Sequence, residues 1–125
     1  MWYYESGKVK REGNYVDGKK EGKTVRYYES GKVKSEGNFV DGKGEGREVS
    51  YHGNGRVNHE THRVNGKEEG KWATYDKNGK LLYEGSHKNG KKDGMQIEYS
   101  ESGKVKRKDC WKNGKSIGVN KSLCE

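Results

Sequence analysis

The sequence predicts an all-β protein, a single-layer antiparallel β-meander of about ten short strands built from five repeats. The chain repeats itself every 24 residues without insertion or deletion. One column of the repeat holds the glycines Gly7, Gly31, Gly55, Gly79 and Gly103. Another column holds the tyrosines Tyr3, Tyr27, Tyr51, Tyr75 and Tyr99. Within a unit, apolar and polar residues alternate, which is the period of a half-buried strand.

Composition alone would favour a disordered chain. Leu, Ile, Val and Phe together number 16 of 125 residues, and the net charge is +8. Low hydrophobicity with high net charge is typical of disorder. However, a disordered chain has no reason to keep its glycines and tyrosines in register. The nine Tyr, three Trp and one Phe bury a large area at few positions, so a thin sheet is feasible.

The second unit shows the expected strands most clearly. Apolar side chains alternate in 24–28 and again in 33–39, with Glu29-Ser30-Gly31 between them. A three-residue turn with Gly31 in the left-handed conformation pairs Tyr27 with Val33 and Val25 with Ser35, which keeps apolar groups on one face. The second connection, which begins at Asp41, is expected to hold five residues.

The whole chain, 1–125, is interpreted as one repeat array. Its units are 1–23, 24–47, 48–71, 72–95 and 96–118, followed by a C-terminal capping strand over 119–125. The sequence has no apolar run near 18 residues, so a transmembrane segment is not expected. Because Met1 leads directly into repeat sequence, we expect no signal peptide and a cytoplasmic location.

The repeated elements carry a family resemblance. Tyr-Tyr-Glu-x-Gly-Lys and Asp/Asn-Gly-Lys-x-x-Gly recur along nearly the whole chain. These units resemble the bacterial variant of the MORN repeat, found in proteins often labelled antitoxins of the YwqK family. The resemblance implies an all-β, non-enzymatic binding module. The antitoxin label implies a protein that neutralises a toxin by direct contact.

A first candidate site is an apolar strip on the second face of the sheet. Its residues are Tyr4, Val16, Tyr28, Val40, His52 and Val64. The equivalent positions of the last two repeats are polar: Asp76, Ser100, Lys88 and Lys112. Exposed apolar strips mark interaction surfaces, so this strip is the expected partner-binding site. The alternative is local packing of these side chains against lysine stems.

A second candidate is the basic surface of the array. Two ladders of cations follow the turn glycines: Lys8, Lys32, Arg56, Lys80 and Lys104, and Lys19, Lys43, Lys67, Lys91 and Lys115. The densest basic patch consists of Lys104, Lys106, Arg107, Lys108, Lys112 and Lys115. Such a surface suits phosphates or an acidic protein. The alternative is a set of solvated turn lysines.

Catalysis and metal binding are not expected. The segment His59-Glu60-Thr61-His62 lacks the H-E-x-x-H spacing, and residues three apart on a strand point to opposite faces. No nucleophile, base and orienting group recur together. We therefore expect neither an enzyme, nor a metal site, nor a cofactor.

The leading functional expectation is an antitoxin-like inhibitor that neutralises a toxin or nuclease by direct contact. An anti-CRISPR-type inhibitor, encoded by a mobile element and aimed at a host defence nuclease, fits equally well. Two further alternatives are a MORN-type scaffold that binds lipid headgroups and a basic nucleic-acid-binding protein. Phosphate or headgroup binding weakens steeply with salt, whereas an apolar protein interface does not.

The two cysteines are expected to be free. In the predicted register Cys110 lies opposite Asn120, and Trp111 opposite Val119, which offsets Cys124 by four residues, roughly 13 Å. A disulfide needs Cα atoms about 4.4–6.8 Å apart. Two free thiols would agree with a reducing cytoplasm.

Overall fold

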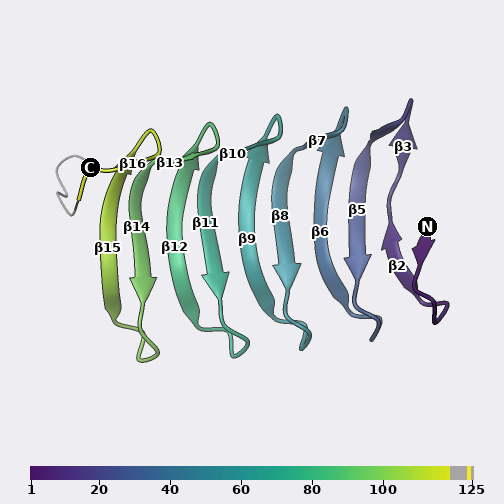
Figure 1. Cartoon of the computed structure of the whole chain (residues 1–125), viewed down its shortest axis with the longest axis horizontal. Helices are drawn as coiled ribbons and strands as arrows, with labels where there is room; N and C mark the ends of the chain where they lie inside the picture. The colour runs from purple at the N-terminus through teal and green to yellow at the C-terminus, as the bar shows by residue number, and fades with distance from the viewer. Residues whose placement is uncertain (119–123, 125) are drawn as a thin grey trace.

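The computed structural model describes residues 1–118 and residue 124. Its strands follow one another in chain order, and fourteen of them form one antiparallel sheet in a single layer (Figure 1). No helix occurs among the described residues, and none could therefore span a membrane there. The predicted all-β, single-layer meander is confirmed.

Each of the last four repeats contributes a six-residue strand and an eight-residue strand, and short two-residue strands flank the turns. The bounds are β1 Trp2–Tyr3, β2 Val9–Glu12, β3 Tyr15–Val16, β4 Lys19–Lys20, β5 Gly22–Tyr27, β6 Val33–Val40, β7 Lys43–Gly44, β8 Gly46–Tyr51, β9 Val57–Val64, β10 Lys67–Glu68, β11 Gly70–Tyr75, β12 Leu81–Lys88, β13 Lys91–Lys92, β14 Gly94–Tyr99, β15 Val105–Lys112 and β16 Lys115–Ser116. The short pair β3–β4 forms a separate two-stranded sheet.

The predicted three-residue turn is confirmed. The Tyr28 amide donates to the Lys32 carbonyl at 2.8 Å, and the Gly31 amide donates to the Tyr28 carbonyl at 2.9 Å. Gly31 has a φ of +92°, a conformation that side-chain-bearing residues rarely adopt. Tyr27 pairs with Val33, as expected.

The expected pairing of Val25 with Ser35 is wrong. The register shifts just beyond the turn: Tyr27 pairs with Val33, but Arg26 pairs with Ser35. Lys34 is therefore an extra residue, a β-bulge, and Val25 pairs with Glu36 instead. The same shift follows the turns of the three later long hairpins. Because one extra residue reverses the alternation, everything beyond Lys34 on β6 faces the side opposite to the predicted one.

The expected five-residue second connection is also wrong. Asp41 and Gly42 alone form a two-residue turn, with φ values of +51° and +81°, and Val40 pairs with Lys43. Positive φ at both central residues defines the type I′ turn, for which Asp-Gly and Asn-Gly are the preferred pairs. These turns and the three-residue turns lie at opposite ends of the strands (Figure 1).

The sheet has two faces of different character. Val25, Tyr27 and Glu36 lie on what we call the Tyr–Glu face, and Thr24 and Phe39 on what we call the variable face. The positions of the second repeat on the variable face are Thr24, Arg26, Tyr28, Ser35, Gly37 and Phe39, with their equivalents in the other repeats. The apolar core is small: Val25 and Val49 are buried on the Tyr–Glu face, with exposed fractions of 7% and 2%.

The prediction of two free thiols is wrong, because Cys110 and Cys124 form a disulfide with Cα atoms 5.8 Å apart. The error comes from the second connection. Since that turn holds two residues, Trp111 pairs with Ser116 rather than with Val119, and the Ile117 amide donates to the Cys110 carbonyl. The argument from free thiols for a reducing cytoplasm is therefore removed. The expected capping strand over 119–125 lies outside the described residues, apart from Cys124.

Candidate functional site

The Tyr–Glu face repeats the same contact along the array. A tyrosine hydroxyl donates to a glutamate carboxylate in three places: Tyr27 to Glu12 at 2.5 Å, Tyr51 to Glu36 at 2.9 Å and Tyr99 to Glu84 at 2.6 Å. The carboxylate bond, followed by burial, raises the pKa of Tyr27 and of Tyr99. For Tyr51, burial comes first and the bond to Glu36 second in raising the pKa. This face is a regular framework that holds the hairpins together.

The variable face changes from repeat to repeat. Its first column reads Thr24, Glu48, Trp72 and Gln96. A second column reads Arg11, Ser35, His59, Tyr83 and Arg107, and a third reads Tyr15, Phe39, Arg63, His87 and Trp111. The backbone of each hairpin is nevertheless the same. Chemical variety on an unchanging backbone is what a recognition surface requires, so the candidate functional site lies on this face.

The tyrosine column of the predicted strip joins neighbouring repeats. The Tyr4 hydroxyl donates to the Tyr27 carbonyl at 2.6 Å, and the Tyr28 hydroxyl donates to the Tyr51 carbonyl at 2.5 Å. His52 Nε2 lies 2.8 Å from the Tyr75 carbonyl in the same relationship. These side chains are half-buried, and part of each is engaged in holding one repeat on the next.

The fourth repeat replaces this contact with a local one. Asp76 occupies the column and accepts hydrogen bonds from the amides of Asn78 and Lys80 in its own turn. The bond from the Lys80 amide is the main reason that the pKa of Asp76 is lowered. The tyrosine contact is thus confined to the first three repeats, with a histidine in the third.

The valine column of the predicted strip lies on the other face. Val40 follows Phe39 on β6, so it lies on the Tyr–Glu face, and it directly precedes the two-residue turn. Val16, Val40 and Val64 are about half exposed. The expectation that Tyr28 and Val40 share one face is therefore wrong, because the bulge at Lys34 separates them.

The lysines of the turns contact the following repeat. The stem of Lys19 lies beside Gly42, that of Lys43 beside Gly66 and that of Lys91 beside Gly114, so that a Cβ atom added at each glycine would meet the stem at an ordinary van der Waals distance. Arg56 donates to the Asn78 carbonyl, and Lys80 Nζ donates to the Glu101 carbonyl at 3.2 Å. This arrangement favours a structural role for both ladders.

The predicted C-terminal basic patch is distributed over both faces and a turn. Lys106 pairs with Glu98 at 3.7 Å, Arg107 with Asp109 at 3.6 Å and Lys112 with Asp93 at 3.8 Å. Lys108 pairs with Ile97 in the ladder and lies on the Tyr–Glu face, opposite to Arg107. Lys104 and Lys115 are exposed beside turns. The sequence cluster does not form one continuous surface.

Sequence reasoning missed a different basic cluster, which lies on the variable face of repeats 1 and 2. Its cations are Lys10, Arg11, Lys20, Arg26 and Lys34. Aromatic side chains lie among them: Trp2, Tyr4, Tyr15, Tyr28 and Phe39. We call this set the cationic–aromatic patch. Its detection from sequence requires the bulge, which places Phe39, and with it Lys20, on the face of Arg26 and Tyr28.

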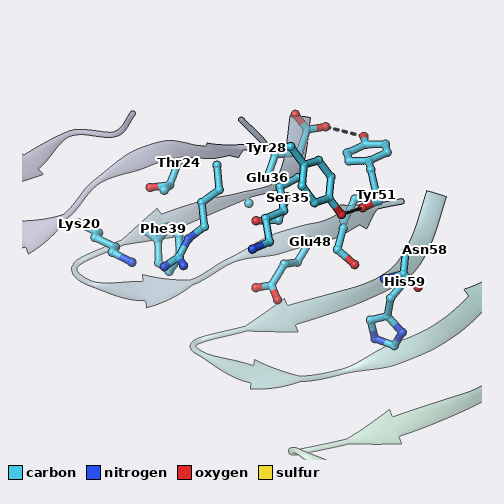
Figure 2. A pocket seen from close by; sticks show the side chains of 15 residues that line it. Lys20, Thr24, Tyr28, Ser35, Glu36, Phe39, Glu48, Tyr51, Asn58 and His59 are labelled. Carbon is cyan, nitrogen blue, oxygen red and sulfur yellow. Dashed lines mark hydrogen bonds between the residues drawn. The ribbon is translucent and has the colours of Figure 1, made fainter. Parts of the chain in front are cut away.

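The patch is hollowed by two shallow grooves. One of about 390 Å³ is lined by Lys20, Arg26, Tyr28, Lys34 and Phe39, together with other residues of repeats 2 and 3 that include Glu36 and Glu48. The second, of about 290 Å³, lies over repeat 1 and shares Arg26 and Lys34 with the first. Figure 2 shows Lys20 beside Phe39 in the larger groove, and Tyr51 bonded to Glu36.

Repeats 3 and 4 carry a polar network on the same face. Arg63 contacts Glu48 at 3.0 Å and Glu68 at 3.5 Å, and His87 contacts Glu68 at 2.9 Å. Trp72 lies between the rings of His59 and His87. Charges are mutually compensated here, in contrast to the cationic–aromatic patch.

The two histidines of the rejected metal motif lie apart. His59 Nδ1 contacts the Thr74 hydroxyl at 2.7 Å, and His62 Nδ1 lies 3.1 Å from the Lys71 carbonyl. Within the described residues, no group of three or more His, Cys, Asp or Glu side chains is arranged to hold a metal ion.

A comparison with protein families identifies the repeats. The family described as "MORN repeat variant" matches residues 1–17, 20–41, 68–89 and 92–113, which is more than half of the chain. The unmatched stretch between 41 and 68 contains most of the third repeat, where the glycine and aromatic columns hold Thr61 and Arg63. No curated protein matches the chain.

Proposed function

Because the chain belongs to the MORN repeat variant family, and because its repeats differ chiefly on one face, we propose that it is a non-enzymatic protein-binding module whose variable face contacts a partner protein. More specifically, the proposal is an antitoxin-like inhibitor that neutralises a toxin or nuclease by direct contact. An inhibitor encoded by a mobile element and aimed at a defence nuclease would act in the same way.

One observation carries this proposal: the constant and the changing side chains are on opposite faces. On the Tyr–Glu face, Tyr27, Tyr51 and Tyr99 are engaged in hydrogen bonds to glutamates of neighbouring strands. The variable face presents Trp, Tyr, Phe and Arg, the residue types enriched at the centres of protein interfaces. A rigid repeat scaffold that displays such residues in rows suits the recognition of a large surface.

The turn lysines supply less support for a scaffold that binds lipid headgroups or nucleic acid. The stems of several of them lie beside the glycines of the next turn, and some of the cations donate to backbone carbonyls. A surface that bound phosphates through these ladders would show affinity that falls steeply with salt. A protein interface through the variable face would depend on salt more weakly.

The test is site-specific photo-cross-linking in extract of the source cell. A benzophenone amino acid is placed at Phe39, on the variable face, or at the adjacent Val40, on the Tyr–Glu face. We expect a discrete protein adduct from position 39 and none from position 40. An adduct formed only from position 40 would contradict the assignment of the face, and nuclease-sensitive adducts would replace the protein partner by a nucleic acid.

A further inference from the structure

The N-terminal part of the variable face carries cations that no carboxylate of the described residues neutralises. The ion pairs involve Lys23, Arg47, Arg63, His87, Lys106, Arg107 and Lys112. Lys10, Arg11, Lys20, Arg26 and Lys34 are absent from these pairs. On the same face of later repeats, Arg63 and Arg107 each have an acidic partner. Lys92, which lies over the Trp111 ring on the same face, is also absent from these pairs, but it stands alone. The cationic–aromatic patch differs from the later repeats in gathering five such cations in two neighbouring repeats.

We propose that the cationic–aromatic patch is a docking surface for a carboxylate-rich segment of the partner protein. This inference rests on the proposed function and adds the chemistry of the partner. Charge complementarity is the first argument: several cations without counter-ions, held on one face, attract an acidic surface and accelerate its association.

The second argument is that the cations are held in place by aromatic rings. The Arg11 guanidinium lies 4.0 Å from the centre of the Trp2 ring, and Lys20 Nζ lies 4.8 Å from that of Phe39. A cation over a ring face is attracted by the ring quadrupole. Cations positioned in this way lose less conformational freedom when a carboxylate arrives.

The same rings distinguish a protein from single-stranded nucleic acid. Nucleic acid binding of this type needs aromatic faces on which bases stack. Here cations lie over the rings of Trp2, Tyr4, Tyr28 and Phe39. A base would have to displace the cation before stacking, whereas a carboxylate reaches the cation without disturbing the ring. The arrangement therefore favours acidic side chains over a polynucleotide.

The third argument is continuity across two repeats. Arg26 and Lys34 line both grooves, so the hollow over repeat 1 lies next to the hollow over repeats 2 and 3. An extended chain segment lying along these grooves would meet Arg11, Arg26 and Lys20 in turn. The polar network of Arg63, Glu48 and Glu68 follows in the third repeat, where the charges are already paired.

The experiment measures fluorescence anisotropy with three labelled probes: a peptide of alternating Glu and Leu, its analogue with Gln in place of Glu, and an oligothymidylate with the charge of the acidic peptide. The test variant is R11Q/R26Q. The matched control is K77Q/K115Q, which removes the same charge from exposed positions in or beside turns of repeats 4 and 5. Circular dichroism verifies that both variants keep the fold.

We expect the acidic peptide to bind, the Gln analogue to bind weakly or not at all, and R11Q/R26Q to lose at least about tenfold in affinity for the acidic peptide. The control should lose about twofold or less, through the smaller net charge alone. Equal losses in both variants would overturn the proposal, and so would tighter binding of the oligothymidylate. If position 39 cross-links a protein while R11Q/R26Q binds that protein as the control does, the docking chemistry is wrong and the proposed function stands.

Discussion

The Tyr28 hydroxyl donates a hydrogen bond of 2.5 Å to the backbone carbonyl of Tyr51, one repeat further along the chain. The side chain of one hairpin therefore satisfies a polar backbone group of the next. Tyr4 makes the same contact with Tyr27. In a single-layer sheet with few buried apolar residues, such contacts couple neighbouring units, as a repeat array requires.

Loss of this hydroxyl should destabilise the array. We expect Tyr28→Phe to lower the free energy of unfolding by about 1 kcal/mol, because a half-buried carbonyl loses its donor. Tyr15→Phe is the control, since Tyr15 is exposed and its contact is with the ring of Trp2. Urea unfolding of both variants measures the difference. Equal unfolding midpoints for Tyr28→Phe and Tyr15→Phe would mean that the Tyr28 hydrogen bond adds nothing to stability.

Two glycines with open surroundings separate backbone strain from steric clash. A Cβ atom at Gly31 or at Gly53 would meet nothing within 4 Å, but only Gly31 has a positive φ, of +92°. Gly31→Val should therefore cost about 1–3 kcal/mol through the left-handed backbone, and Gly53→Val much less. The comparison is made by thermal unfolding, and the reverse order would contradict the turn geometry.

The tyrosine–glutamate contacts predict a loss of stability in alkali. Because the pKa values of Tyr27, Tyr51 and Tyr99 are raised in the folded protein, the neutral phenols are favoured by folding. Their contribution is fully present below the unfolded pKa of about 10 and is lost as the pH rises through the higher folded values.

The check is the melting temperature as a function of pH, for the parent and for the variant with Phe at all three positions. We expect the parent to lose more stability above about pH 10 than the variant does. Lysine titration is common to both proteins and cancels in the difference. Parallel curves would show that the three hydroxyls are not favoured in their neutral form.

The disulfide should stabilise the C-terminal repeat. Cys110 and Cys124 close a loop with a sequence separation of 14, and such a loop contributes roughly 3 kcal/mol in the chain-entropy description. We expect no reactive thiol in the unreduced, denatured protein and a lower unfolding midpoint after reduction. The Cys110→Ser/Cys124→Ser variant should unfold like the reduced protein. Two titratable thiols per chain would contradict the pairing.

Much of the fold follows from the sequence because the same glycine and tyrosine positions recur in all five repeats. The glycine column fixes the three-residue turn, and the pairing of Tyr27 with Val33 follows from it. The bulge at Lys34 has no distinctive residue, since its equivalents are Asn58, Leu82 and Lys106, so the register shift could not be read from residue type. Because of this one extra residue, the positions beyond Lys34 on β6 lie on the face opposite to the predicted one. The valines of the predicted strip therefore lie on a different face from its tyrosines.

The second connection, in contrast, was predictable. Asp41-Gly42 and its Asn-Gly equivalents are the strongest short hairpin signal, and their recognition would have given the two-residue turn. The disulfide depends on that turn. The cationic–aromatic patch depends on the bulge instead, because only the observed register places Arg26 opposite Ser35 and Phe39 on the same face as Arg26 and Tyr28.

The most direct test of the variable face compares two charge deletions on one strand. Arg26 and Lys23 both lie on β5, three residues apart and on opposite faces. Calorimetry is carried out with the free partner protein that the cross-linking identifies. It should show that Arg26→Gln weakens binding by about tenfold or more, while Lys23→Gln leaves the affinity within about twofold. If Lys23→Gln weakens binding as much as Arg26→Gln, or more, the partner does not recognise the variable face.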